Sequence, residues 1–464
     1  MLGKLVKFII LSRVSKGGLI LLSIFSVAGV LIDFSLYEAE AYGHLHLYPL
    51  SYSLGYMTAF YALIALFGGM SAMRPDLDYL FTLPVDRKLL SLALFISNTI
   101  LMSFLMTFLT TFSFNAYLFF VSPLLGVSLV SLNVMLREVR ALHKALIVTL
   151  IALWFLSPIW GFPFSPTSAA LGYLPNSLAV TAVYTAILTY LALKRLENYD
   201  LIVVRSLTAN PEVVEQTVTF GPSTPLRAFI KLRLAYLSFS GRMRYAGVHA
   251  GRLIRPAGMM PALSASALLA VIYYIIFKTL SASNVNSVES GISIAVVSTT
   301  GIGSILGVSN LTTERAWLTV PYLGPKFIRY LSLGAWVQTI TLFLPIAIAN
   351  LALSIYNPLF LYAGLIILVD VPVISAFSVY LQAVILPIQL KDELTLLNSE
   401  LRVRNSISSF FSLALYILEM FVVQWQSLTL VLGMGLGMAL LLVLLTRDEL
   451  ARKVINQMTE MGYV

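Results

Sequence analysis

Long apolar stretches recur along this chain of 464 residues, and they restrict its fold more than any other feature. Each stretch is roughly 17–25 residues long, the length that an α-helix needs to cross the hydrocarbon core of a bilayer. Only 11% of the residues are charged, whereas a soluble domain carries about a quarter. The sequence therefore predicts an all-α polytopic membrane protein. About twelve transmembrane helices are expected, at residues 17–36, 53–73, 89–113, 116–136, 145–160, 176–194, 261–280, 291–311, 328–352, 361–386, 406–424 and 427–446.

The basic residues fit these spans when the N-terminus and the C-terminus are both cytoplasmic. In that orientation only Lys278, among the 30 Lys and Arg residues, falls on the outer side. The positive-inside rule explains this bias, so the net charge of +9 reflects membrane topology rather than nucleic-acid binding. We expect a multi-pass protein of the cell (plasma) membrane with no nucleic-acid partner. Because the chain has no cysteine, disulfides, thiolate metal sites and cysteine nucleophiles are excluded.

Two short charged segments, each placed between two apolar stretches, follow the same plan. Residues 74–84 and residues 313–321 each carry a carboxylate, then an aromatic or large apolar pair, then Thr-x-Pro. This internal repeat predicts two similar six-helix transmembrane halves. They are expected at residues 1–195 and 259–464, joined by a cytoplasmic linker with an amphipathic segment at residues 196–258.

The first charged segment has the properties of a short helix at the membrane surface. In a helix that starts at Asp76, Leu77, Leu80 and Phe81 fall on one apolar face, and Asp76 lies at the positive N-terminal end. A helix of this kind can seat in a groove on a soluble motor subunit, whereas the alternative is an interfacial loop anchored by aromatic residues. The expected coupling residues are Asp76, Asp78, Tyr79, Leu80, Phe81, Pro84 and Arg87 in the first segment, and Glu314, Arg315, Trp317, Leu318 and Pro321 in the second.

The order of elements in the first half resembles the type 2 (export-type, ABC-2) permeases of ATP-binding cassette transporters. Those permeases begin with an amphipathic helix, place a coupling helix between the second and third spans, and form short outer helices between the fifth and sixth. Residues 2–14, 74–84 and 157–175 take these three places, and residues 76–90 look like the acidic, leucine-rich, Pro-Val-x-Arg stretch of the family. The second half is less similar, because Tyr322-Leu323-Gly324-Pro325-Lys326 replaces Val-Asp-Arg and its last outer loop is short.

The resemblance implies a transport subunit that is not an enzyme and has no catalytic residue, metal or cofactor of its own. It would move a hydrophobic or amphipathic substrate outward, such as a lipid, a peptide or a drug. ATP and Mg²⁺ would be bound by a separate ATPase chain, because this sequence has no Gly-x-x-x-x-Gly-Lys-Ser/Thr phosphate loop. Two coupling segments in one chain predict two ATPase copies per permease chain. A homodimer is the alternative if one chain is only half a transporter, and membrane lipids are the remaining partner.

Two carboxyl groups lie inside apolar stretches, Asp370 in the tenth and Glu419 in the eleventh. A charged group at such a position costs several kcal/mol unless it has a partner. The pair could carry ions in an ion-coupled secondary transporter, which is the alternative function, or line a translocation path. A structural bond to Ser, Asn or Arg on a neighbouring helix is equally open. The glycine pair at 303 and 307, and the run at 433, 435 and 437, predict close helix packing.

Overall fold

The computed structural model describes residues 2–13, 50–67, 85–111, 115–136, 141–196, 224–245, 248–281, 285–313, 319–385 and 425–460, with isolated positions between 20 and 31, at 113 and 139, and between 414 and 423. Among the described residues, eight helices are long and apolar enough to cross a membrane. The protein is therefore a helical membrane protein. The candidate membrane spans within these helices start at Lys88, Ala116, His143, Leu174, Ala262, Lys326, Leu359 and Leu428.

Ten of the twelve predicted spans overlap a helix of the structure. Eight of them are the helices just named, and the other two overlap α3 (Leu50–Phe67) and α11 (Val285–Thr313). The first and eleventh predicted spans, at 17–36 and 406–424, lie largely outside the described residues. The total of twelve therefore stays a prediction.

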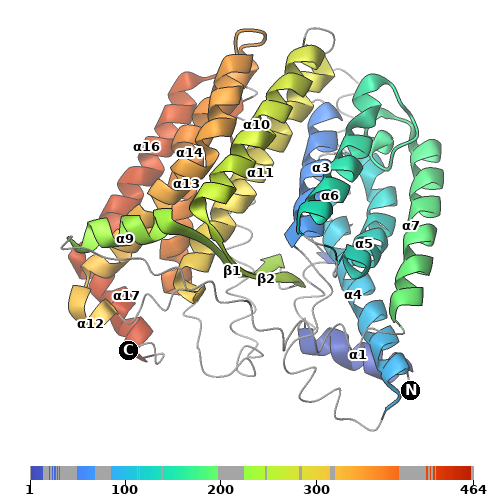
Figure 1. Cartoon of the computed structure of the whole chain (residues 1–464), viewed down its shortest axis with the longest axis horizontal. Coiled ribbons are helices and arrows are strands. Elements are labelled where there is room, and N and C mark those ends of the chain that lie inside the picture. The colour runs from blue at the N-terminus through green and yellow to red at the C-terminus, as the bar shows by residue number, and fades with distance from the viewer. Residues whose placement is uncertain are drawn as a thin grey trace. The chain divides into compact units, whose positions relative to one another are not determined.

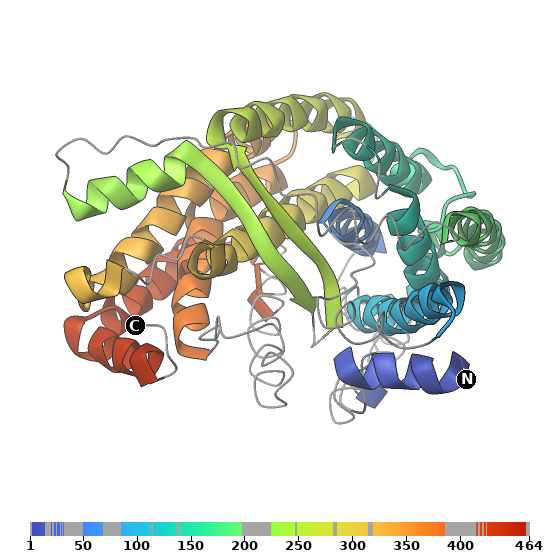
Figure 2. The ribbon, with the colours of Figure 1, turned by 60° about the horizontal axis from the view of Figure 1, so that its bottom comes forward.

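The chain forms two compact units, and unit 1 contains helices α1 to α7. In unit 1, α4 packs on α5, α5 packs on α7, and α3 lies against α5 and α6. The helix α1 runs across α4 (Figures 1 and 2). The carboxylate of Asp86 caps α4 by accepting a hydrogen bond of 3.1 Å from the backbone N–H of Lys88. The remaining bounds are α1 Leu2–Arg13, α4 Arg87–Thr110, α5 Ala116–Leu136, α6 Ala141–Leu156 and α7 Leu174–Leu196.

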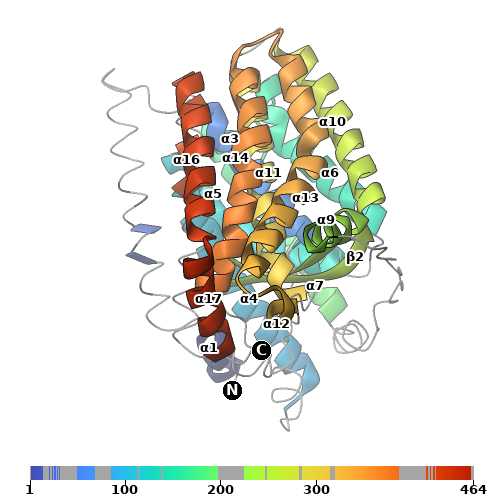
Figure 3. The same cartoon turned by 90° about the vertical axis from the view of Figure 1, so that its left-hand side faces the viewer.

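Unit 2 contains α9 to α17, and the contacts among α9, α13, α14 and α16 match those among α1, α4, α5 and α7 in unit 1. Here α13 packs on α14, α14 packs on α16, and α11 lies against α14 and α10. The helix α9 runs across α13, and α17 continues from the lower end of α16 (Figures 1 and 3). The bounds are α9 Pro225–Ala235, α10 Met259–Ser281, α12 Val320–Leu323, α13 Lys326–Leu353, α14 Leu359–Ile385, α16 Leu428–Leu445 and α17 Asp448–Glu460. The predicted segment boundaries at 195 and 259 stay predictions.

A β-hairpin lies between α9 and α10, in the predicted linker. Its strands are β1 (Tyr236–Tyr245) and β2 (Val248–Gly258), and they pair into a two-stranded sheet. The amphipathic segment predicted after Pro225 is therefore a helix only in α9. The missed signal was Gly247, because two short runs separated by two residues that include glycine are typical of a hairpin.

Several helices expose apolar faces. On α7, Val183, Ile187 and Tyr190 form a stripe at helical spacing, and each side chain is more than half exposed. Similar exposed side chains follow α10, where Leu268 and Ile275 are examples. Contiguous apolar surface of this kind is unfavourable in water and is suited to the hydrocarbon core of a membrane.

Candidate functional site

Most of the predicted coupling residues lie outside the part of the chain that the structure describes. The described ends of the two segments are the first turn of α4 and the single turn α12. Arg87 is the first residue of α4, directly after its cap Asp86, and Pro321 is the second residue of α12. The residues outside the described part are Asp76, Asp78, Tyr79, Leu80, Phe81 and Pro84, and Glu314, Arg315, Trp317 and Leu318.

The short helix α12 has one buried side and one exposed side. Val320 is buried, whereas Pro321 is exposed and Tyr322 is 84% exposed. Gly324 follows with a φ of 52°, which glycine adopts easily, and the chain turns there into α13. The end of the second charged segment is thus held against the helices of unit 2 while Pro321 and Tyr322 face outward.

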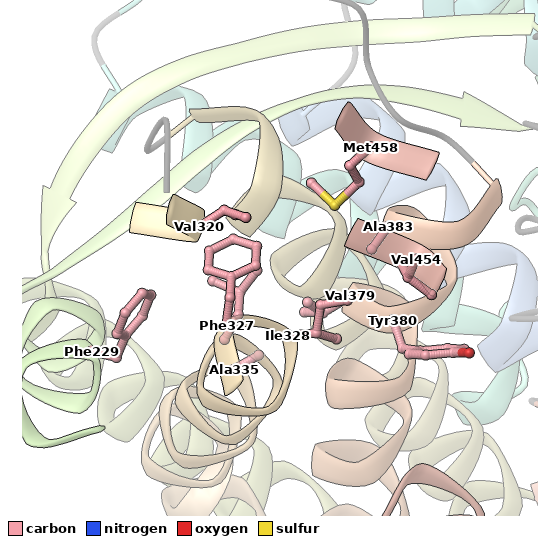
Figure 4. Close-up of a cluster of buried hydrophobic side chains, with 11 residues drawn as sticks. Phe229, Val320, Phe327, Ile328, Ala335, Val379, Tyr380, Ala383, Val454 and Met458 are labelled. Atoms are coloured by element: carbon pink, nitrogen blue, oxygen red, sulfur yellow. The ribbon is translucent and has the colours of Figure 1, made fainter. Parts of the chain in front are cut away.

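Val320 belongs to a cluster of buried apolar side chains that we name the basal cluster (Figure 4). Five helices contribute to it: α9, α12, α13, α14 and α17. Close packing of these side chains stabilises the contacts among the five helices. The basal cluster therefore ties the second charged segment to the lower ends of α13 and α14. Its residues are Phe229, Val320, Phe327, Ile328, Leu331, Ala335, Val379, Tyr380, Ala383, Val454 and Met458.

The amphipathic helices α9 and α17 both bury one face in the basal cluster. On α9, the ring of Phe229 packs edge to face on the ring of Phe327, with the two ring centroids 6.4 Å apart. From α17, Val454 and Met458 are buried one turn apart, as expected for an amphipathic helix. The side-chain amide of Gln338 on α13 also donates a hydrogen bond of 3.2 Å to the backbone carbonyl of Arg233 on α9.

The segment between α6 and α7, which the predicted topology places on the outer side, contains two short 3-10 helices, at Ser157–Trp160 and Ser168–Leu171. Each ends at a glycine with positive φ, Gly161 at 77° and Gly172 at 89°. The side-chain amide of Asn115 at the start of α5 donates a hydrogen bond of 3.1 Å to the carbonyl of Ala170, which fixes the segment to the N-terminal end of α5. Short helices were predicted at this place, and their insertion into the membrane stays a prediction. The exposed side chains of the segment include Trp160, Phe162 and Phe164.

A hydroxyl network joins three helices in the middle of unit 1. The buried hydroxyl of Tyr61 on α3 lies 3.0 Å from the hydroxyl of Ser128 on α5 and 3.2 Å from the hydroxyl of Tyr184 on α7. Ser128 also donates a hydrogen bond of 2.8 Å to the carbonyl of Leu125. These polar groups are therefore satisfied by one another within the protein.

Unit 2 has two buried carboxyl groups instead. Asp370 on α14 and Glu419 in the eleventh predicted span are both fully buried, and they are close enough to interact electrostatically. Thr300 on α11 donates a hydrogen bond of 2.9 Å to Oε2 of Glu419. Three carboxyl oxygens have no hydrogen-bond partner among the described residues: both oxygens of Asp370 and Oε1 of Glu419. The sequence predicted a bond to Ser, Asn or Arg, whereas Glu419 accepts a hydrogen bond from a threonine, and Asp370 has no side-chain partner within the part of the chain that the structure describes.

The glycine predictions are confirmed for one group and wrong in part for the other. A side chain at Gly307 would collide with the backbone carbonyl of Ser375, and one at Gly303 would contact Val371 at 3.1 Å, so this pair brings α11 against α14. In α16 only Gly435 is packed, because Gly433 and Gly437 have open space beside them. A side chain at Gly435 would collide with Oδ1 of Asp370.

Comparison with known protein families, with curated proteins and with solved structures finds no match to this chain. The function is therefore inferred from the sequence motifs and from the geometry of each unit.

Sequence reasoning missed several residues that the structure brings into the site. Thr300 lies in the predicted eighth span, but a single threonine in an apolar helix gives no sign of its partner. The burial of Arg233 was unexpected, because a basic residue in a cytoplasmic amphipathic helix ordinarily faces water. The docking of α17 could have been found, since Ala451, Val454 and Met458 have helical spacing in an otherwise polar segment.

Proposed function

We propose that this chain is the transmembrane permease of an ATP-binding cassette exporter of type 2. It would move a hydrophobic or amphipathic substrate, such as a lipid, a peptide or a drug, outward across the cell membrane. ATP hydrolysis would take place in a separate ATPase subunit that binds ATP and Mg²⁺. The two charged segments at 74–84 and 313–321 would be the contacts between the permease and its motor.

The observation that carries this proposal is the construction of α12. Its outward-facing Pro321 and Tyr322 stand on a buried anchor, Val320, which packs in the basal cluster with the lower ends of α13 and α14. A motor subunit that pushes on the segment would therefore move two long helices together, because packed interiors transmit displacement. An interfacial loop without a buried anchor would lack this property.

The matching order of helices in the two units supports the reading as two related halves. Within each unit, an amphipathic helix contacts the third span, the third span packs on the fourth, and the fourth packs on the sixth. Two equivalent halves would offer two equivalent contacts, and we propose two ATPase copies for each permease chain. In the proposed cycle, closure of the ATPase pair pushes both contacts, and the halves rock apart to pass the substrate.

Affinity capture of the tagged chain in mild detergent tests this proposal. We expect an ATPase with a Walker motif to copurify, and we expect Asp76→Lys and Glu314→Lys each to reduce its recovery at least fivefold. Lys278→Glu is the matched control, because it reverses a charge on the predicted outer side, and it should leave recovery unchanged. Capture of the chain without any ATPase would contradict the proposal.

A second candidate is an ion-coupled secondary transporter that uses Asp370 and Glu419. The observation in its favour is the burial of both carboxyl groups, one of them without a hydrogen-bond partner among the described residues. Asp370→Asn and Glu419→Gln would abolish substrate transport by such a carrier. In the ATP-driven exporter that we propose, the same variants retain transport that depends on ATP.

A further inference from the structure

The two units place a polar residue at the same position on corresponding helices. In α5 and α14, an asparagine side chain just before the helix accepts a hydrogen bond from the backbone N–H two residues on: Asn115 from Tyr117 at 3.1 Å and Asn357 from Leu359 at 3.0 Å. Thirteen residues beyond Asn115 lies Ser128, and thirteen residues beyond Asn357 lies Asp370. At 1.5 Å per residue, both lie about 20 Å along the helix, on the same side relative to the cap.

The surroundings of these two positions differ in one respect. Around Ser128, the hydroxyls of Tyr61 and Tyr184 complete a closed network within unit 1. Around Asp370, the described part of unit 2 leaves polar atoms without partners, although the residue is fully buried. The hydroxyl of Ser128 is therefore satisfied within unit 1, whereas the carboxyl group of Asp370 has no partner among the described residues.

Four of the unpartnered side-chain atoms of unit 2 belong to three segments that lie near Asp370, since Gly303, next to Ser304, faces Val371, next to Asp370. The four atoms are both carboxyl oxygens of Asp370, Oε1 of Glu419 and the hydroxyl of Ser304, none of which has a hydrogen-bond partner among the described residues. Ser304 is buried and lies one turn along α11 from Thr300, on the same face, and Thr300 bonds Glu419. The helix α16 leaves space for Asp370 by having glycine at position 435.

No positive charge within the described residues compensates the two carboxyl groups. Neither has a basic partner there. The helix α16 carries no titratable side chain, and apart from the pair itself the titratable residues of α11 and α14 are Glu289, Tyr362 and Tyr380. The basic residues of α13 and α17, which also pack on α14, are Lys326, Arg329, Arg452 and Lys453. The first turns of α13 and the helix α17 meet α14 in the basal cluster, at Val379 and beyond, away from Asp370. Uncompensated burial of a carboxylate costs far more than burial of a neutral polar group, so a positive species is needed for the charged form.

The atoms available to bind a positive ion indicate which kind of ion would bind. All the available atoms are oxygens, which are the ligands of hard cations. The described residues contain no group of three or more acidic, histidine or cysteine side chains that could hold a metal ion. Two neighbouring carboxyl groups tend to share one proton, which leaves a single negative charge for one monovalent cation. We propose that Asp370, Glu419, Thr300 and Ser304 form a binding site for one monovalent cation, sodium or hydronium, in unit 2 alone. This site is independent of the motor contacts of the proposed function.

Radioactive ²²Na⁺ binding to the purified full-length chain in detergent tests the sodium form of the site. We expect saturable binding at one ion per chain, reduced at least tenfold by Asp370→Asn and by Glu419→Gln, and severalfold by Gly435→Ala, which pushes a methyl group against the Asp370 carboxyl. Ser128→Ala alters the corresponding position of unit 1, so it is the matched control and should bind sodium as the unmodified chain does.

A melting curve at several pH values, with choline as the only cation, tests the hydronium form. If hydronium is the occupant, sodium does not bind, acid raises the Tm of the unmodified chain, and Asp370→Asn removes that rise. The proposal is overturned if the unmodified chain responds neither to sodium nor to acid, or if Asp370→Asn and Glu419→Gln keep its response. Because no ATPase is present in these measurements, their failure leaves the exporter proposal standing, and loss of the ATPase partner leaves the cation site standing.

Discussion

Units 1 and 2 share a helical frame, but their interiors at mid-depth carry different chemistry. In unit 1, α5 follows a capping asparagine and packs against α4 and α7. In unit 2, α14 follows a capping asparagine and packs against α13 and α16. Inside, unit 1 has the uncharged network of Tyr61, Ser128 and Tyr184, whereas unit 2 has the carboxyl groups of Asp370 and Glu419. The difference indicates that the same arrangement of helices can hold an uncharged polar network in one unit and buried carboxyl groups in the other.

The two units also hold their amphipathic helices differently. In unit 1, Ser97 on α4 reaches the carbonyl of Val6 on α1 only at 3.4 Å, and it bonds Ala93 more closely at 2.6 Å. In unit 2, α9 is held by the contact between the rings of Phe229 and Phe327 and by the hydrogen bond from Gln338. Unit 2 also has the helix α17 directly after α16, whereas the described residues of unit 1 include no helix directly after α7. The second charged segment therefore rests on a base for which the described part of unit 1 offers no counterpart.

The largest effect is expected in the basal cluster. Met458→Ala removes a fully buried side chain from α17, and such changes cost about 2–5 kcal/mol. We expect α17 to detach, so that its amide hydrogens exchange at least tenfold faster while those of α13 stay protected. Leu450→Ala on the exposed side of α17 is the control. Unchanged exchange in Met458→Ala would show that the basal cluster does not hold this helix.

The next largest loss of stability is expected where a glycine lets two helices approach closely, and this contact differs between the two units. Gly126 on α5 faces the backbone of Ser103 on α4, whereas Gly364 on α14 faces the side chain of Leu351 on α13, which can move. We expect Gly126→Ala to lower the free energy of unfolding by about 1–3 kcal/mol, and Gly364→Ala by less than about 1 kcal/mol. Gly437→Ala, which enters open space, should be neutral. Equal losses in the first two variants, measured by denaturation in mixed micelles, would contradict the geometry.

A smaller effect separates the two polar interiors. Thr300→Val removes the hydrogen bond that Glu419 receives and leaves a buried carboxyl without a donor, at a cost of about 1–3 kcal/mol. Tyr61→Phe removes one hydroxyl from a network that can partly rearrange, and bonds between membrane helices average about 0.6 kcal/mol. We therefore expect the threonine variant to melt at the lower temperature, and the reverse order would break the comparison.

The smallest effect concerns the amphipathic helices. Gln338→Met keeps the size of the side chain and removes the hydrogen bond to Arg233, so a loss of about 1 kcal/mol is expected. Ser97→Ala should cost less than about 0.5 kcal/mol, because its bond to α1 is long. Limited proteolysis between each helix and its bundle should be faster for the glutamine variant. Equal rates would mean that the two helices are held alike.

Much of the fold follows from the sequence, because a membrane span must be both long and apolar. Helices overlap ten predicted spans, and the boundary at Arg87 follows from Asp86, whose side chain caps α4. The hairpin at 236–258 was not predicted, since positive charge and sparse apolar residues obscured its strand pattern. Asp370 and Glu419 were found because charge is rare in apolar stretches.

The partners of these carboxyl groups could not be found in the same way. Thr300, Ser304 and Gly435 are ordinary residues for membrane helices, and nothing local distinguishes them. Their roles depend on which helices meet, and that is set by packing across distant parts of the chain. The correspondence of Ser128 and Asp370 also appears only when the two asparagine caps are seen to be equivalent.

We propose that one chain supplies two related halves, each with a contact for a motor subunit. Native mass spectrometry of the complex purified from membranes tests it most directly, because it counts the subunits. We expect one copy of this chain with two copies of an ATPase. A complex that contains two copies of this chain, or one ATPase per chain in the fully assembled state, would contradict it.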